Sequence, residues 1–235
     1  LETVTYGIRD GRSISFDDFS ELGFKVPSLK EQRKIGKTLT VIDTLIRKLE
    51  QKLEKLRSIK QSLLNQMFIN VNGGYTPLIR FKGFEDEWMT IKLCDISKKV
   101  IEKNATSVCQ DVFTNSAEFG VINQRDFFDH DVANVDNIQG YYIVRPNDYV
   151  YNPRISTTAP VGPINRNKLG CCGVMSPLYY VFRVEKQSDG ILHFLDYYFK
   201  SNMWHDFMFK NGNSGARSDR FSISDSTFSL MPILY

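Results

Sequence analysis

The sequence predicts an α+β protein in which a mixed α/β globular domain is attached to one long coiled-coil helix. Three observations carry this prediction: a helical repeat over residues 28–68, mixed strand and helix patterns after residue 78, and 42% hydrophobic residues. A composition of this kind is typical of a globular protein with a hydrophobic core. The length of 235 residues fits one or two domains.

Residues 1–27 contain short strand-like and turn patterns, among them Thr3–Tyr6 and Ser13–Phe16. So few residues bury too little surface to form a core of their own. The sequence therefore predicts that this segment belongs to another folded unit.

Residues 28–70 form the predicted helix. Ser28 and Glu31 directly follow Pro27 and have the spacing of a capping box. Asparagine and glycine at 70–74, with Pro77 beyond them, predict the end of the helix. Apolar residues recur in steps of four and three, which is the period of a coiled-coil seam. The seam positions are Ile35, Leu39, Ile42, Ile46, Leu49, Leu53, Leu56, Leu63 and Met67, and Lys60 is a polar position in the series.

An ordinary amphipathic core helix is the alternative interpretation of this segment. At about 1.5 Å per residue, however, the helix is roughly 60 Å long, which exceeds the width of a small domain. The length favours a partner helix that covers the seam. That partner is a second copy of the chain or the other half of a longer protein.

Residues 71–235 predict a compact mixed domain. The strand candidates are 108–113, 120–124, 141–144, 149–151 and 176–184, and residues 191–210 have helical spacing with a break at Ser201-Asn202. A glycine-rich loop follows at 211–215, and residues 221–235 contain short strand-like patterns.

One internal similarity links the two ends of the chain. Ser13-Ile14-Ser15 and Phe19 correspond to Ser222-Ile223-Ser224 and Phe228 at a constant spacing, which also pairs Phe24 with Ile233. Chance is one explanation for so short a match. A repeat of the form domain, helix, domain, helix is the other. In that repeat, residues 1–27 are the tail of a preceding domain.

Several motifs resemble those of type I restriction–modification specificity subunits. The resemblance rests on residues 27–35 (PSLKEQRKI), Ile42-Asp43, the Lys60-x-x-Leu-Leu run, 79–84 (IRFKGF) with Trp88, 120–124 (GVINQ), 148–155 (DYVYNPRI), 176–179 (SPLY) and 215–217 (GAR). Taken in order, these motifs span essentially the whole chain. Each motif alone is only moderately specific.

The resemblance implies a non-catalytic subunit that recognises double-stranded DNA. In this family two target-recognition domains, separated by conserved helices, each bind one half of a split target. Modification subunits methylate adenine, and restriction subunits supply ATP-driven translocation and cleavage. This chain has one target-recognition domain and one conserved helix, so we expect either a piece of a specificity subunit or a half-length one that pairs through its helix.

The residues predict no enzymatic chemistry. Asn152-Pro153-Arg154-Ile155 lacks the second proline and the aromatic residue of amino-methyltransferase motifs, and no glycine-rich phosphate loop follows a strand. His130, His193 and His205 lack metal-ligand spacing. The acidic group Asp126, Asp129 and Asp131 suits a solvated turn better than a metal site. We therefore expect no cofactor and no metal.

DNA contact is predicted for three loop regions. Arginine suits guanine, and asparagine or glutamine suits adenine, in the major groove, while loop lysine and arginine suit phosphates. The candidates are Asn123, Gln124, Arg125, Asn152, Arg154, Arg166, Lys168, Arg217 and Arg220. The net charge of +3 permits DNA binding without demanding it. The alternative function is a coiled-coil module that docks modification subunits without recognising bases.

The remaining expectations concern the cellular environment. The sequence contains no apolar run of about 18 residues, so no membrane span is expected. Residues 1–13 lack the apolar core of a signal peptide. Cys94, Cys109, Cys171 and Cys172 contain no metal-binding pair and are expected to be reduced. These observations predict a cytoplasmic protein that does not associate with membranes.

Overall fold

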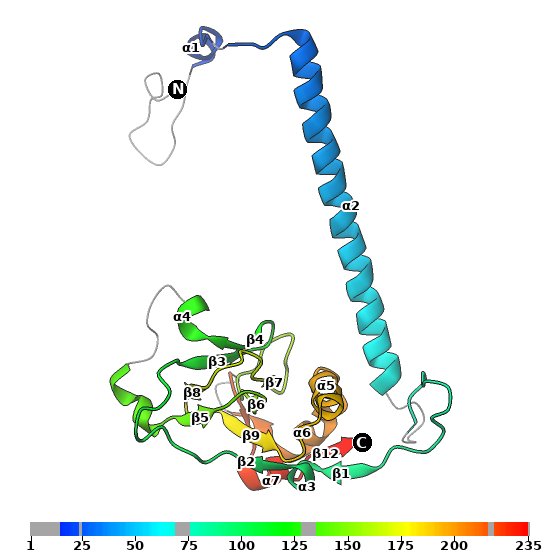
Figure 1. Cartoon of the computed structure of the whole chain (residues 1–235), viewed down its shortest axis with the longest axis vertical. Coiled ribbons are helices and arrows are strands. Elements are labelled where there is room, and N and C mark those ends of the chain that lie inside the picture. Colours follow the sequence, from blue (N-terminus) through cyan, green and yellow to red (C-terminus); the bar gives the residue numbers. More distant parts are fainter. Residues whose placement is uncertain (1–14, 24, 69–75, 128–134, 216–218, 235) are drawn as a thin grey trace. The chain divides into compact units, whose positions relative to one another are not determined.

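The computed structural model describes residues 15–23, 25–68, 76–127, 135–215 and 219–234 (Figure 1). The chain divides into two compact units, Leu1–Ser58 and Ile59–Tyr235. The boundary lies within helix α2 (Leu29–Phe68), so the last turns of this helix belong to the second unit. The described residues form helices and antiparallel strand pairs, which confirms the predicted α+β class.

The first unit contains a short helix, α1 (Phe16–Ser20), before α2. The hydroxyl of Ser15 accepts a hydrogen bond from the amide of Asp18 at 3.1 Å, and Asp17 lies in the first turn. A serine cap and early acidic residues stabilise a helix N-terminus. The strand pattern expected near Phe16 is therefore wrong, because local capping favours a helix there. Residues 1–14 and Phe24 lie outside the described residues.

Helix α2 confirms the long helix that the apolar period predicts. The amide of Glu31 donates to the Ser28 hydroxyl at 3.4 Å, and the Gln32 side chain donates to the Pro27 carbonyl at 2.8 Å. Among the described residues of the helix, none is buried. In the second unit, Phe68 of its last turn packs against Phe194 with ring centroids 5.4 Å apart. Phe68 also contacts Trp88 and Tyr198.

A four-stranded antiparallel sheet forms the centre of the second unit. Its order is β2 (Ser97–Lys99), β9 (Tyr180–Val184), β6 (Tyr149–Tyr151) and β7 (Ile164–Arg166). Successive side chains of a strand point to opposite faces. Accordingly, Tyr149 and Tyr151 of β6 lie in one core cluster, whereas Val150 lies in another. The sheet is thus covered on both faces.

Helices cover one face of this sheet (Figure 1). They are α3 (Leu93–Ile96), α5 (Asp189–Tyr198), α6 (His205–Asn211) and α7 (Asp225–Ser229). Apolar side chains of α5, including Leu192 and Leu195, are almost fully buried there. A strand pair, β1 (Thr90–Lys92) with β12 (Pro232–Leu234), joins the beginning of the domain to the end of the described chain.

Two small strand pairs belong to the other face. They are β3 (Phe113–Ser116) with β4 (Gly120–Asn123), and β5 (Tyr142–Val144) with β8 (Gly173–Met175). The remaining elements are α4 (Gln124–Phe127), the 3-10 helix η1 (Val135–Gly140), β10 (Asn213–Ser214) and β11 (Phe221–Ser222).

A disulfide joins Cys109 to Cys172, whose Cα atoms are 6.1 Å apart. The prediction that all four cysteines are reduced is therefore wrong for this pair. The pairing depends on tertiary proximity across a sequence separation of 63, which the sequence pattern does not reveal. Cys94 and Cys171 are free and exposed.

Several predicted elements are confirmed and others are displaced. The strand expected at 149–151 is confirmed, as is the helical break at Ser201-Asn202 between α5 and α6. The strand expected at 108–113 begins only at Phe113, and the strand expected at 176–184 begins at Tyr180. Residues 225–229 form helix α7 instead of a strand, because Ser224 caps their amides.

The internal similarity has a local structural counterpart. Ser15 caps α1 by accepting from Asp18, and Ser224 caps α7 by accepting from Thr227, each at 3.1 Å. The two helices begin alike, but their surroundings differ: Phe228 of α7 is 1% exposed and Phe19 of α1 is 57% exposed. The shared capping fits the repeat. Among the described residues, α1 buries no side chain, whereas α7 buries Phe228 in an aromatic core.

Over the described ranges, no helix is both long enough and apolar enough to span a membrane.

Candidate nucleic-acid interface

Buried asparagines fix the β3–β4 hairpin against the central sheet. The side chain of Asn115 donates to the carbonyl of Val150 at 2.7 Å and accepts from Asn165 at 2.8 Å. The Asn152 side chain donates to the Asn115 carbonyl at 2.8 Å. Buried polar groups are costly unless they are hydrogen-bonded, so this network favours one arrangement of the hairpin and the loop after β6.

The loop after β6 presents Arg154 at the surface. The Asn152 side-chain oxygen accepts from the Arg154 amide at 3.0 Å, which shapes the turn. Gly162 closes the loop with a φ of +82°, and a Cβ there would lie 2.0 Å from the Asn152 carbonyl oxygen. Arg154 forms an antiparallel bridge with Arg220, and the Phe221 amide donates to the Pro153 carbonyl at 2.7 Å. Two segments far apart in sequence thus bring their arginines together.

These segments and the hairpin line a surface pocket of about 410 Å³, which we call the Arg154–Arg220 pocket. Its lining consists of Thr114, Ser116, Ile122, Gln124, Asn152, Pro153, Arg154, Ser176, Leu178, Tyr179 and Arg220. Arg154 and Arg220 are exposed, and the lining contains no acidic residue. The side-chain oxygen of Gln124 is buried and has no hydrogen-bond partner among the described residues. The pocket therefore combines cationic donors with amide and hydroxyl groups, the types that contact base edges and phosphates.

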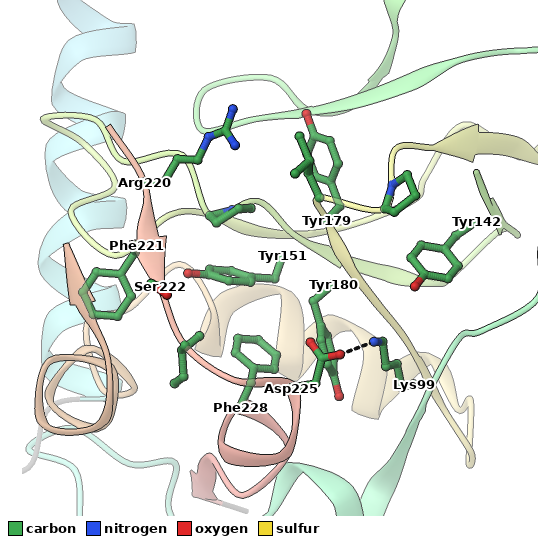
Figure 2. Close-up of a pocket in the computed structure, with 14 residues that line it drawn as sticks. Lys99, Tyr142, Tyr151, Tyr179, Tyr180, Arg220, Phe221, Ser222, Asp225 and Phe228 are labelled. Atoms are coloured by element: carbon green, nitrogen blue, oxygen red, sulfur yellow. Dashed lines mark hydrogen bonds and ion pairs between the residues drawn. The ribbon is translucent and has the colours of Figure 1, made fainter. Parts of the chain in front are cut away.

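A second hollow of about 330 Å³, the tyrosine pocket, adjoins the first and shares Pro153, Leu178, Tyr179 and Arg220 with it. Figure 2 shows Arg220 and Tyr179 at one end of this pocket and the ion pair of Lys99 with Asp225 at the other. Burial raises the pKa of Tyr180 to about 12, so this phenol stays neutral at physiological pH. The pocket thus offers aromatic faces and the neutral hydroxyl of Tyr180, with Arg220 at one end.

Arg166 and Lys168 lie elsewhere, beside Asp196 of α5. Arg166 bonds both Asp196 oxygens, at 3.0 and 2.7 Å, and Asn147 at 2.8 Å, while its side chain is only 9% exposed. Burial opposes ionisation of Asp196, but hydrogen bonds from Arg166 and Lys168 outweigh it and lower the pKa of Asp196. The geometry favours a structural role for Arg166, whereas the Lys168 side chain is 57% exposed.

The remaining predicted DNA contacts are Asn123, Arg125 and Arg217. The Asn123 side chain donates to Asp111 at 3.1 Å and accepts from the Arg125 amide at 3.2 Å. Arg125 is exposed at the start of α4. Arg217 lies outside the described residues. The structure therefore brings Gln124, Asn152, Arg154 and Arg220 together and leaves Arg166 and Lys168 in a separate group.

Sequence reasoning missed several residues of the pocket lining. Thr114 and Ser116 alternate along β3 and face the pocket together with Ile122 of β4. Tyr179 joins them, because its hydroxyl lies 3.1 Å from the Thr114 hydroxyl. The run of three polar residues Thr114-Asn115-Ser116 was the available signal, but assigning two of them to the pocket needed the correct strand boundary.

Potential metal ligands are dispersed over the described part of the chain. No group of three or more histidine, cysteine or acidic residues there is placed to hold a metal ion. Asp129, His130 and Asp131 lie outside the described residues. Burial lowers the pKa of His205, which packs against the Trp204 ring with centroids 4.8 Å apart. A packed, neutral histidine at this position fits a structural role.

The seam of α2 is uncovered in the chain by itself. From Ile35 to Leu63, every seam residue is at least 43% exposed. Lys60, the polar exception, lies in the second unit with its ammonium 5.7 Å from the centroid of the Tyr197 ring. The polar position of the seam thus lies in the turns of α2 that belong to the same unit as the globular domain.

Comparison with known proteins supports the family that the motifs suggest. Residues 9–57 match the family model described as "Type I restriction modification DNA specificity domain". The resemblance to specificity subunits is thereby confirmed over these residues, which include most of α2. No similarity to a curated protein was found.

Solved structures give two similarities. The crystal structure of the HsdS subunit from Thermoanaerobacter tengcongensis is 13% identical, with a TM-score of 0.44 over 97% of this chain and 52% of that chain. A structure described as showing complex assembly and conformational transition of the type I R-M system is 11% identical, with a TM-score of 0.37. That match covers 88% of this chain and 48% of the other. The chain spans about half the length of both.

Proposed function

We propose that this chain recognises one half of a bipartite DNA target as part of a type I restriction–modification specificity subunit. The contacts are made by the Arg154–Arg220 pocket, and the chain itself performs no catalysis. Methylation of adenine and cleavage are carried out by modification and restriction subunits that assemble with it. The segment before α2 is, in this proposal, the tail of a preceding target-recognition domain.

The observation that carries the proposal is that predicted DNA-contacting residues from separate segments meet in one pocket. Gln124, Asn152, Arg154 and Arg220 come from three separate segments, and all four line one pocket. Arg154 has no hydrogen bond or ion pair to its guanidinium among the described residues, so it is available to a ligand. An unpaired arginine beside amide groups suits bidentate contact with base edges. The family match over residues 9–57 supports DNA as that ligand.

The test is selection from a pool of random double-stranded DNA, followed by titration of the enriched duplex against a scrambled one. One short sequence should be enriched. Its affinity should exceed that for scrambled DNA and should fall steeply with salt, because phosphate contacts release counterions. If every duplex binds equally, or none binds, the recognition proposal is wrong and the chain is better explained as a docking module.

Arg154→Ala tests the pocket directly. Loss of a bidentate base contact should weaken binding of the enriched duplex by about 1–3 kcal/mol and relax preference at one base position. Lys82→Ala, an exposed cation outside the pocket lining, is the matched control. An intact preference in the Arg154 variant would show that the contact surface lies elsewhere.

The uncovered seam supports a second part of the proposal, a helical partner for α2. Apolar seam residues that stay exposed along a helix of 40 residues are typical of one strand of a coiled coil. The partner helix comes from a second copy or from the other half of the specificity subunit. Modification subunits then bind around the paired helices.

A further inference from the structure

Basic side chains gather where α5 meets the last turns of α2, within the second unit. The ammonium groups of Lys60 and Lys200 lie 5.7 and 5.9 Å from the centroid of the same ring, that of Tyr197. Lys60 therefore lies close to α5. It is also the one polar residue at a position of α2 where the coiled-coil pattern calls for an apolar residue. Its side chain belongs to the surface of the domain and not to the helical seam.

A small pocket of about 140 Å³, the Asp196 pocket, adjoins this cluster. Arg166, Lys168 and Lys200 line it, together with Asp196, Glu118 and the hairpin tip at 117–120. Arg166 and Asp196 form its floor, because their side chains are only 9% and 7% exposed and are held in a bidentate pair.

The three cations that line this pocket outnumber its two carboxylates, those of Asp196 and Glu118. Arg166 and Lys168 both bond the same Asp196 oxygen, at 2.7 and 2.6 Å. Lys200 has no ion pair of its own among the described residues, and burial, followed by the nearby charges of Lys60 and Lys168, lowers its pKa. Cations that crowd one another without enough carboxylates are stabilised when an anion binds between them.

The β3–β4 hairpin lies between this pocket and the Arg154–Arg220 pocket. Its tip at 117–120 borders the Asp196 pocket, whereas Thr114, Ser116 and Ile122 border the Arg154–Arg220 pocket. A ligand with phosphates at regular intervals can therefore contact both sides of one hairpin. A DNA duplex has this property, since it carries one negative charge for about every 1.7 Å of its axis.

We propose that Lys60, Lys168 and Lys200 bind backbone phosphate of the DNA whose bases contact the Arg154–Arg220 pocket. This inference rests on the proposed function. Phosphate contacts fix the position and orientation of a duplex without recognising its sequence. The cluster would therefore hold the duplex in register on the hairpin, and Lys60 would connect the end of the helix directly to the bound DNA.

The experiment measures affinity against salt concentration for the full chain and for Lys200→Gln and Lys60→Gln. Each variant should reduce the magnitude of the negative slope of log K against log[salt] by about 0.9 for each lost phosphate contact. The affinity loss should be the same factor for the enriched and the scrambled duplex. Lys186→Gln, an exposed lysine outside the pocket, is the control and should leave the slope unchanged. Lys200→Arg should retain the slope.

The outcomes separate this inference from the proposed function. If the unmodified chain prefers no sequence, the recognition proposal has failed, independently of the lysines. If it prefers a sequence but the Lys60 and Lys200 variants keep its salt slope, only the phosphate site is wrong. A loss confined to the enriched duplex would also overturn the inference, because a phosphate contact affects all sequences alike.

Discussion

The ion pair of Asp196 with Arg166 provides the sharpest test of which predicted DNA contacts are structural. We consider Asp196→Ala, which removes the carboxylate from a pair whose side chains are 7% and 9% exposed. Arg166 then keeps its charge in the interior, and among the described residues its remaining hydrogen-bond acceptor is Asn147, at 2.8 Å. The hydroxyl of Tyr149 also loses one acceptor, although it still donates to the Leu192 carbonyl at 2.8 Å.

The expected loss of stability is large. Removal of one partner from a buried ion pair costs about 3–5 kcal/mol, mostly because the remaining charge is left uncompensated. The surface pair of Glu102 with Arg145 is a matched comparison, because its side chains are 45% and 52% exposed. Exposed pairs contribute about 0–1 kcal/mol. Glu102→Ala should therefore change the unfolding free energy by less than a third as much.

Urea denaturation followed by tryptophan fluorescence measures both variants, because Trp204 is 1% exposed in the same core. The midpoint should fall strongly for Asp196→Ala and slightly for Glu102→Ala, at similar slopes. Equal small shifts in the two variants would refute the reasoning, since Arg166 would then be solvated. Arg166 would in that case return to the group of direct DNA contacts.

The pH dependence follows from the lowered pKa of Asp196. A carboxyl with a lower pKa in the folded state contributes its stability above the unfolded-state pKa, roughly 4, and loses it as the pH falls through the folded value. The stability difference between the unmodified chain and Asp196→Asn should therefore be constant from pH 5 to pH 7 and shrink below roughly pH 4. A constant difference at all pH values would contradict this assignment.

Three further predictions concern other parts of the chain. Gly162→Ala should destabilise the domain by roughly 2–4 kcal/mol in thermal or urea unfolding, because its φ is +82° and the new Cβ meets the Asn152 carbonyl. Phe228→Ala should cost about 3–5 kcal/mol, whereas Phe19→Ala should stay within about 0.5 kcal/mol in the chain alone; equal effects would argue against an isolated α1. Leu49→Pro should abolish pairing of the seam, because proline inside a helix costs about 3 kcal/mol or more. If analytical ultracentrifugation finds the same mass for the variant and the unmodified chain, pairing with a second copy through the seam is refuted.

Local and periodic features of the fold could be predicted from the sequence. Capping at Ser28 and the apolar period of residues 35–67 act within a few residues of the chain, so the long helix is found at the predicted place. Strand β6 and the break after α5 were likewise evident from composition and pattern. Helix α7 was missed because its cap is a single serine in a sequence that otherwise resembles a strand.

For the candidate site, the sequence predicted residue types, whereas their separation into two groups needed the structure. Loop composition predicted Arg154 and Arg220 as cations suited to DNA, and the family motifs suggested DNA as the ligand. Only the tertiary structure distinguishes them from Arg166, because the presence of Asp196 beside Arg166 depends on how α5 packs against β7. The disulfide of Cys109 with Cys172 has the same origin, a contact between residues 63 apart.

The sequence by itself therefore determined the long helix, its apolar seam and the kind of chemistry that its loops carry. These properties depend on near neighbours in the chain and on a simple period. The tertiary structure decided which basic residues are buried in ion pairs within the fold and which are exposed to a ligand. That distinction depends on long-range packing, since burial and a facing carboxylate convert one arginine into part of the core and leave another at the surface.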